Sequence, residues 1–201
     1  QAIARFEEMA DRAERFTAQI KLRIAGKPIA DRLVSMFDPD ARPIRKGKLG
    51  KPNEFGYVLQ ICEVTQNTRR GARGFILPTS TRPGNPPESK LLPDTVSELR
   101  RLGLRPREVA LDGGFEQRPT AEALHELEPD RVFIAGRQRP GSRRTQRRLS
   151  RYRTGAEGRI SHLKRSYGLR RSRLKGEPGM RAWSAWSILA YNLDTLAIRT
   201  T

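Results

Sequence analysis

VALDGGFEQRPTAEALHELEPDRVFIA, residues 109–135, changes its hydrophobic pattern twice. The apolar run at 109–111 leads into Asp112-Gly113-Gly114, which predicts a strand that enters a tight turn. Residues 120–127 have the pattern of a short helix, and the apolar run at 131–135 predicts another strand. A strand, a helix and a strand in succession indicate the α/β fold class.

The sequence upstream of this unit predicts more strands than helices. Apolar runs at 33–37, 55–64 and 74–78 predict three strands, and residues 91–102 have helical spacing that ends at Gly103. The order is therefore three strands, a helix, a strand, a helix and a strand. This order is compatible with a mixed five-stranded sheet.

Downstream of residue 135 the sequence predicts two helices. Thr154 and Glu157 have the spacing of a capping box, so one helix is expected to begin there and to end at Gly168. A last helix is expected over 178–198, with an apolar stripe that packs in the core. The stripe consists of Met180, Trp183, Trp186, Leu189, Leu193 and Leu196.

The N-terminal residues form a separate unit in this interpretation. Apolar residues at spacings of three and four predict a helix over 2–24, and Gly26 and Pro28 follow it. We therefore expect a helical lead-in over residues 1–28 and a domain over residues 29–201. Because the chain does not begin with Met, the lead-in is interpreted as the end of a missing N-terminal region that binds DNA.

Positive charge is concentrated in one part of the chain. The 201 residues have a formal net charge of +18, and the window 131–175 holds 16 basic residues against one acid, a net charge of +15. Solvated surfaces normally mix both signs, so this pattern predicts a polyanionic partner, which we interpret as nucleic acid. Most of these residues are arginine, whose planar guanidinium suits bidentate contact with phosphate.

The composition excludes several classes of protein. Hydrophobic residues make up 36% of the chain, and no apolar run approaches the ~18 residues of a membrane-spanning helix, so no membrane partner is expected. One cysteine, Cys62, excludes an internal disulfide and a cysteine-based zinc cluster. A reducing, cytoplasmic location is expected.

Three acids stand at the ends or beginnings of expected elements: Asp38, Asp112 and Glu157. If the first and fourth strands are neighbours, the two aspartates meet at one sheet edge and Glu157 lies above them. Carboxylates grouped in this way hold Mg²⁺ or Mn²⁺, and two such ions about 4 Å apart serve phosphodiester cleavage. The residues alone leave simpler roles open. Glu157 also fits a capping box or an ion pair with Arg153, and each aspartate also fits a turn or a cap.

Several segments together resemble the transposases of bacterial insertion sequences, whose RNase H-like domain carries an Asp, Asp, Glu triad. The most specific is the spacing of Arg153, Glu157 and Lys164, with three and six residues between them. Two positions depart from the family: Ser150 replaces a tyrosine, and Glu88 stands where an aspartate often follows Asn-Pro. The other segments are MFDPDARPIRKGK (36–48), EFGY (54–57), GNP (84–86), LDGGF (111–115), LKG (174–176) and YNL (191–193).

The resemblance implies an RNase H-like α/β domain over residues 29–201, with a mixed five-stranded sheet flanked by helices. It implies that Asp38, Asp112 and Glu157 are the catalytic triad and bind two Mg²⁺ or Mn²⁺ ions, with Asp40 as the alternative to Asp38. The expected reaction is metal-dependent cleavage of DNA at the element's end, followed by attack of the freed 3′-hydroxyl on target DNA. The alternative is a truncated or inactive transposase that only binds DNA.

The expected partners are the ends of an insertion sequence and target DNA, in a bacterial cytoplasm and on the nucleoid when bound. A homodimer or a larger synaptic assembly is also implied by the resemblance. The residues expected to contact the DNA backbone are all basic. They are Lys46, Lys48, Arg143, Arg144, Arg147, Arg148, Arg153, Lys164, Arg170, Arg171 and Arg173.

Overall fold

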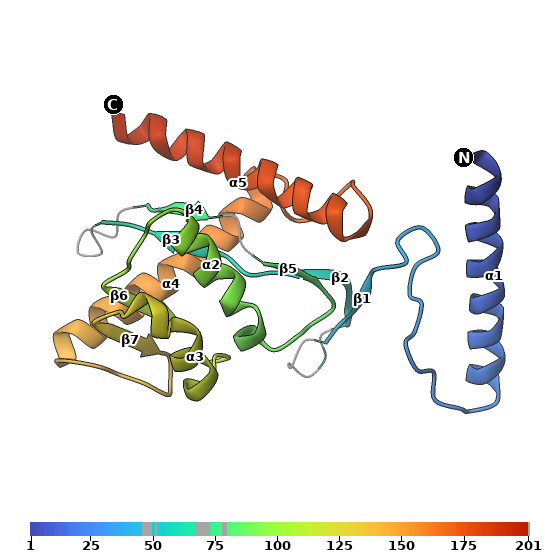
Figure 1. Ribbon diagram of the computed structural model, residues 1–201, viewed down its shortest axis with the longest axis horizontal. Helices are drawn as coiled ribbons and strands as arrows, with labels where there is room; N and C mark the ends of the chain where they lie inside the picture. Colours follow the sequence, from blue (N-terminus) through green and yellow to red (C-terminus); the bar gives the residue numbers. More distant parts are fainter. Residues whose placement is uncertain (46–49, 51, 67–72, 78–79, 201) are drawn as a thin grey trace.

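The computed structural model describes residues 1–45, 50, 52–66, 73–77 and 80–200 (Figure 1). The helices are α1 (Ala2–Ile24), η1 (Glu88–Lys90), α2 (Leu92–Arg101), α3 (Gln117–Leu124), η2 (His125–Leu127), α4 (Arg143–Ser166) and α5 (Gly176–Thr200), where η denotes a 3₁₀ turn. The strands are β1 (Arg42–Ile44), β2 (Glu54–Leu59), β3 (Cys62–Val64), β4 (Phe75–Leu77), β5 (Thr81–Pro83), β6 (Glu108–Leu111) and β7 (Arg131–Ile134). The α/β class is therefore confirmed.

The strands form small ladders of two or three. β1, β2 and β5 are antiparallel, β3 pairs antiparallel with β4, and β6 pairs parallel with β7 so that Val109 lies opposite Val132. The backbone N–H of Gln60 donates to the Ser80 carbonyl at 3.0 Å, between the β2–β5 ladder and the β3–β4 ladder. These four strands therefore form one long hairpin, in which β2 and β3 make the first arm and β4 and β5 the second. The predicted five-stranded sheet is not present among the described residues, because irregular backbone at residues 60–61 separates β2 from β3 and no described strand joins these ladders to β6.

The predicted strand over 33–37 is wrong. This segment has no regular structure, and its most buried residue, Leu33, is only 2% exposed. The side chain of Gln19 accepts from the Leu33 N–H at 2.9 Å and donates to its carbonyl at 3.5 Å. Because α1 satisfies the backbone of Leu33, this residue needs no strand partner.

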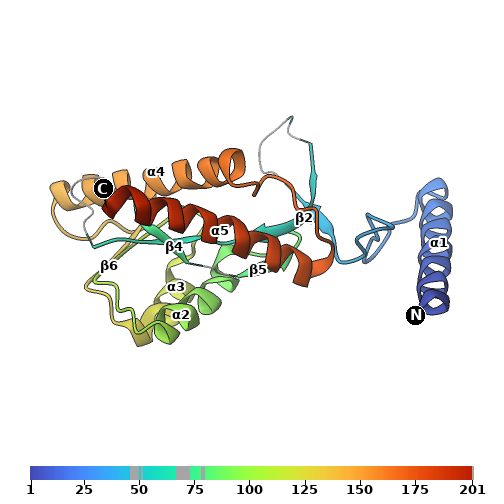
Figure 2. The ribbon, with the colours of Figure 1, turned by 90° about the horizontal axis from the view of Figure 1, so that it is seen from above.

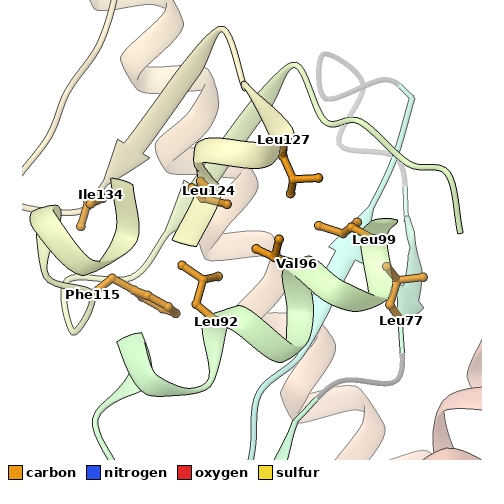
Figure 3. Packing of buried hydrophobic residues seen from close by; sticks show 8 residues of the cluster. All are labelled: Leu77, Leu92, Val96, Leu99, Phe115, Leu124, Leu127 and Ile134. Atoms are coloured by element: carbon orange, nitrogen blue, oxygen red, sulfur yellow. The ribbon is translucent and has the colours of Figure 1, made fainter. Parts of the chain in front are cut away.

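Two hydrophobic clusters lie on opposite faces of the strands. Figure 2 shows α4 on one side of the strands, α2 and α3 on the other, and α5 across them. Leu77 of β4 joins the cluster formed with α2, α3 and β7, which is drawn in Figure 3. Its neighbour Ile76 joins the second cluster, with Leu163 of α4 and Tyr191 of α5. Successive residues of β4 therefore serve different cores, as expected for a strand between two helical layers.

The predicted inner face of α5 is wrong in part. Trp186 is 70% exposed, whereas Ile188 and Tyr191 are buried. Tyr191 packs in the second cluster, and Asn192 bonds both backbone groups of Ile76, accepting from its N–H at 2.9 Å and donating to its carbonyl at 2.7 Å. These contacts pair α5 with the edge of β4 and turn Trp186 outward, whereas Met180 of the predicted stripe packs against the second cluster and Trp183 is half-buried. Leu189, Leu193 and Leu196 are exposed on the same helix.

The first residue of α4 also bears on the site. α4 begins at Arg143, where the Ser142 hydroxyl accepts from the Thr145 N–H. Thr154 therefore lies inside the helix and does not cap it.

α1 lies apart from the rest of the chain in Figures 1 and 2, joined by residues 25–41. The domain boundary at residue 28 stays a prediction. No helix in the described ranges is long and apolar enough to cross a bilayer.

Candidate active site

The parallel pair β6 and β7 positions the first acid of the site. Strand β6 ends at Leu111, whose carbonyl accepts from the Ala135 N–H at 3.1 Å. Asp112 follows directly, and its Oδ1 accepts from the Gly113 N–H at 2.7 Å. Its side chain is 59% exposed. The carboxylate therefore stands in solvent at the carboxyl end of a parallel strand, where open α/β sheets place their ligand sites.

Helix α4 brings a second acid to the same place. Arg153 Nη1 lies 3.2 Å from Asp112 Oδ1 and 2.6 Å from Glu157 Oε1. Arg153 and Glu157 are four residues apart on α4, so both side chains lie on one face of the helix. One guanidinium thus holds two carboxylates from elements far apart in the sequence. The ion pair between Arg153 and Glu157, one of the simpler roles considered from the sequence, is present.

Buried polar contacts hold α4 against the strands. Glu108 of β6 accepts two hydrogen bonds from Arg148, at 2.6 and 2.7 Å, and these bonds lower the pKa of its carboxyl. On the other side, the Glu63 side chain is 3% exposed and pairs with Arg159 at 3.3 Å. The Tyr152 hydroxyl donates to the Glu63 carbonyl at 2.8 Å. These contacts lie on both sides of Arg153 and Glu157 and fix the rotation of the helix.

The structure does not bring Asp38 to the other two acids. Asp38 Oδ1 accepts from the Tyr57 hydroxyl at 2.6 Å and from the Gly176 N–H at 3.2 Å. Asp40 Oδ2 accepts from the Glu177 N–H at 3.4 Å. Both aspartates therefore interact with the N-terminus of α5, where the helix dipole and free N–H groups favour anions. Within the described ranges, no three acidic, histidine or cysteine side chains are grouped as a metal site.

An acid that the sequence-based triad leaves out lies beside Asp112. Glu88 opens η1, and its Oε2 is buried without a hydrogen-bond partner in the described part of the chain. Burial and, next, the charge of Asp112 raise the pKa of Glu88. The signal in the sequence was its place after Asn85-Pro86-Pro87. A second missed residue is Glu63, whose signal was a charge inside an apolar strand.

Some of the residues predicted to contact DNA are already paired with carboxylates of the protein, and others are exposed. Arg148 pairs with Glu108 and Arg153 with the two acids, so their guanidinium groups already have protein partners. Lys46 and Lys48 lie outside the described residues. The others are exposed on α4 or on the segment between α4 and α5: Arg143, Arg144, Arg147, Lys164, Arg170, Arg171 and Arg173.

An α/β domain with two solvent-facing carboxylates beside a basic helix has the features of proteins that process nucleic acids. Comparison with protein families identifies which class of such proteins this is. The family model described as Transposase DDE domain matches residues 41–193. The chain therefore belongs to the Transposase DDE domain family, which implies an RNase H-like fold and DNA binding. The match contains Glu88, Asp112 and Glu157 and begins just after Asp40. Searches of curated proteins and of solved structures returned no match.

Proposed function

We propose that this chain is the catalytic domain of an insertion-sequence transposase that cleaves DNA and joins the freed 3′-hydroxyl to target DNA. The observation that carries the proposal is the convergence of Asp112 and Glu157 on Arg153, at 3.2 and 2.6 Å. The family match supports it, because both acids lie inside the matched residues. Assembly of two or more copies on the element ends belongs to the same proposal.

The site supplies two of the carboxylates that a divalent metal ion would need. Transposases of this family generally use divalent ions, and Mg²⁺ and Mn²⁺ prefer the carboxylate oxygens that Asp112 and Glu157 supply. A positive group, the Arg153 guanidinium, already lies between them. When bound, a pair of ions supplies an activated nucleophile and neutralises charge on the phosphate. Asp38, which binds α5 through the Gly176 N–H, is given no ligand role here.

The chain's own residues position the DNA. Lys164 lies seven residues after Glu157 on α4, on roughly the same face, and is exposed, so it can contact a phosphate beside the scissile bond. Arg153 would be free to contact a phosphate if a metal ion took its place between the two carboxylates. No nucleophilic side chain is required, because water and the 3′-hydroxyl are the two nucleophiles.

The proposal is tested with the purified chain and DNA that carries the element's ends. We expect strand cleavage and strand transfer with Mg²⁺ or Mn²⁺ and none with EDTA, detected on denaturing gels. DNA binding without cleavage under all metal conditions would contradict the proposal and support the alternative, a protein that only binds DNA. Band-shift measurements on the same samples separate the two outcomes.

Two neighbouring arginines on α4 give a matched test of the DNA surface. Arg147 is exposed, so Arg147→Ala should weaken DNA binding and reduce the slope of log K against log salt by about 1. Arg148 is bound to Glu108, so Arg148→Ala should leave the salt slope unchanged and lower the free energy of unfolding by about 1.5–3 kcal/mol. Salt titrations by fluorescence anisotropy and urea unfolding measure both effects. Equal salt slopes for Arg147→Ala and the unmodified protein would remove this face of α4 from the DNA surface.

A further inference from the structure

We infer that the outer faces of the two terminal helices form an interface between two copies of this chain, in which α1 of one copy packs along α5 of the other. The inference names a surface for the assembly that the proposed function includes, and to that extent it rests on the proposed function. Its evidence is a set of exposed side chains on α1 and α5, and its test needs neither DNA nor metal.

The outer face of α5 is an exposed stripe without charge. Its residues repeat at alternating spacings of four and three, which is the a and d pattern that keeps one face of a helix toward a partner helix. Residues 182–198 contain one charged residue, Asp194, and its carboxylate accepts from the Tyr167 hydroxyl at 2.5 Å. A contiguous apolar surface of this kind marks an interaction site. The outer α5 stripe consists of Ala182, Trp186, Leu189, Leu193, Leu196 and Thr200, all exposed.

Helix α1 has an exposed stripe with the same repeat. Spacings of three and four alternate along its whole length, and six of the seven side chains are apolar. Gln19, which bonds the backbone of Leu33, lies on the opposite face of the helix. The contact with the residues that follow α1 therefore leaves this stripe uncovered. The outer α1 stripe consists of Ile3, Phe6, Ala10, Ala13, Thr17, Ile20 and Ile24, all exposed.

The connection between the two helices holds α1 away from α5 of its own chain. Gln19 bonds both backbone groups of Leu33, and five residues later Asp38 accepts from the Tyr57 hydroxyl at 2.6 Å. The connecting segment is thus fixed to α1 at one end and to the strands at the other. Figures 1 and 2 show α1 apart from α5 in both views. A second copy is therefore the partner that can cover both outer stripes.

The sizes of the side chains favour contact between unlike helices. The outer α1 stripe has large residues at its ends and small ones in its middle, at Ala10, Ala13 and Thr17. The outer α5 stripe has large residues in its middle and small ones at its ends, at Ala182 and Thr200. Two α1 stripes laid middle to middle would leave a gap, and a gap loses packing contacts. Laid middle to middle in either direction, α1 and α5 have complementary profiles.

Two-fold symmetry closes this arrangement with two identical contacts. Each copy contributes its α1 to one contact and its α5 to the other, so both stripes of both copies are covered. An aromatic side chain buries about 150–250 Å², and a stable interface buries about 1,200–2,000 Å² in total. The dimer holds two copies each of Phe6 and Trp186, which are already partly covered in the single chain, so these four side chains supply roughly half of the lower limit. The aliphatic residues of both stripes supply the remainder.

Single cysteines test which helices meet. Ala13→Cys and Leu189→Cys lie near the middles of the two outer stripes, so a mixture of the two variants should form a disulfide-linked dimer of unlike chains under mild oxidation, identified by mass spectrometry. Ala18→Cys, which lies off the stripe on the same helix, should not link to Leu189→Cys, and neither should the unmodified chain through Cys62. Links between like helices, or within one chain that carries both new cysteines, would overturn the inference.

Charges placed in the stripes test the same contact without chemistry. Leu193→Glu and Phe6→Glu should each raise the dissociation constant of the dimer about 100-fold or more, measured by analytical ultracentrifugation, because each places a charge in both contacts. Leu102→Glu, which changes an exposed leucine outside the stripes, should leave it unchanged. Circular dichroism checks that all three variants are folded.

Mixing the two charged variants gives the sharpest result. A dimer of one Leu193→Glu chain and one Phe6→Glu chain has one contact without a new charge, so the mixture should associate about tenfold more tightly than either variant alone. Association in the mixture no tighter than in the separate variants would overturn the pairing of α1 with α5.

Asp112→Asn separates this inference from the proposed function. It should form the same dimer, because Asp112 belongs to neither stripe. A chain that stays monomeric at every concentration measured would overturn the interface, whatever its cleavage activity. A dimer that cleaves no DNA with any metal would keep the interface and contradict the proposed function.

Discussion

Asp112→Asn is expected to reduce metal-dependent DNA cleavage by more than about 10³-fold. The substitution preserves the shape of the side chain and its bond to the Gly113 N–H, but it removes the negative charge that a metal ion needs. A bound ion contributes several kcal/mol of charge stabilisation to the transition state, and each 1.36 kcal/mol corresponds to a factor of about ten in rate. Single-turnover cleavage assays with saturating protein measure the loss without interference from product release.

The controls for this prediction come from the same chain. Asp112→Asn should keep DNA binding and unfold at a temperature close to that of the unmodified protein, because Asp112 is exposed. Asp130→Asn, which changes another exposed aspartate, should retain the full cleavage rate. Asp38→Asn tests the alternative taken from the sequence, since the triad requires it to be as inactive as Asp112→Asn. A folded Asp112→Asn protein with an undiminished rate would exclude Asp112 as a metal ligand.

Glu63→Ala is expected to lower the free energy of unfolding by about 3–5 kcal/mol. The Glu63 carboxylate is 3% exposed, accepts from the Gly74 N–H at 2.6 Å and pairs with Arg159. Removing it leaves a largely buried guanidinium and a backbone N–H without an acceptor, and both are costly. The melting temperature should fall by about 6–20 °C for a chain of this size. Thermal and urea unfolding followed by circular dichroism provide the measurement.

Matched variants show whether burial is the cause. Glu122→Ala breaks the ion pair with Arg118, in which the Arg118 side chain is 92% exposed and the Glu122 side chain 65% exposed. This variant should change the free energy of unfolding by less than about 1 kcal/mol. Glu63→Gln keeps an acceptor for Gly74 and loses the charge, so its stability should lie between those of the unmodified protein and Glu63→Ala. Equal and small effects of Glu63→Ala and Glu122→Ala would show that the buried pair does not hold α4 to the hairpin.

The elements that could be predicted well are those whose pattern is local. The helix over 2–24 corresponds to α1, the helix over 91–102 to α2, and the apolar runs at 109–111 and 131–135 to β6 and β7. In each case hydrophobic spacing and a terminating glycine or turn lie within the segment itself. The family was also accessible from the sequence, because its motifs are short and have defined spacing.

The errors have a common physical origin. An apolar run such as 33–37 does not show which of its residues are buried or whether a strand or a helix covers them. Here only Leu33 of the run is buried, and Gln19 of α1 bonds its backbone. On α5, the stripe with the largest side chains was expected inside. The structure buries the face with Ser184, Ile188 and Tyr191, because that face fits against β4 and leaves Trp186 outside.

The strands β6 and β7 with the helix between them, the positive charge and the family motifs follow from the residues themselves, because periodicity, charge and spacing are properties of neighbours along the chain. Only the tertiary structure decides which acids pair with the same guanidinium and which arginines are already paired with a carboxylate of the protein. Ion pairs and desolvation depend on distances through space, which the sequence does not show. Arg153 and Arg148 therefore look alike in the sequence. One of them holds Asp112 and Glu157 and the other holds Glu108.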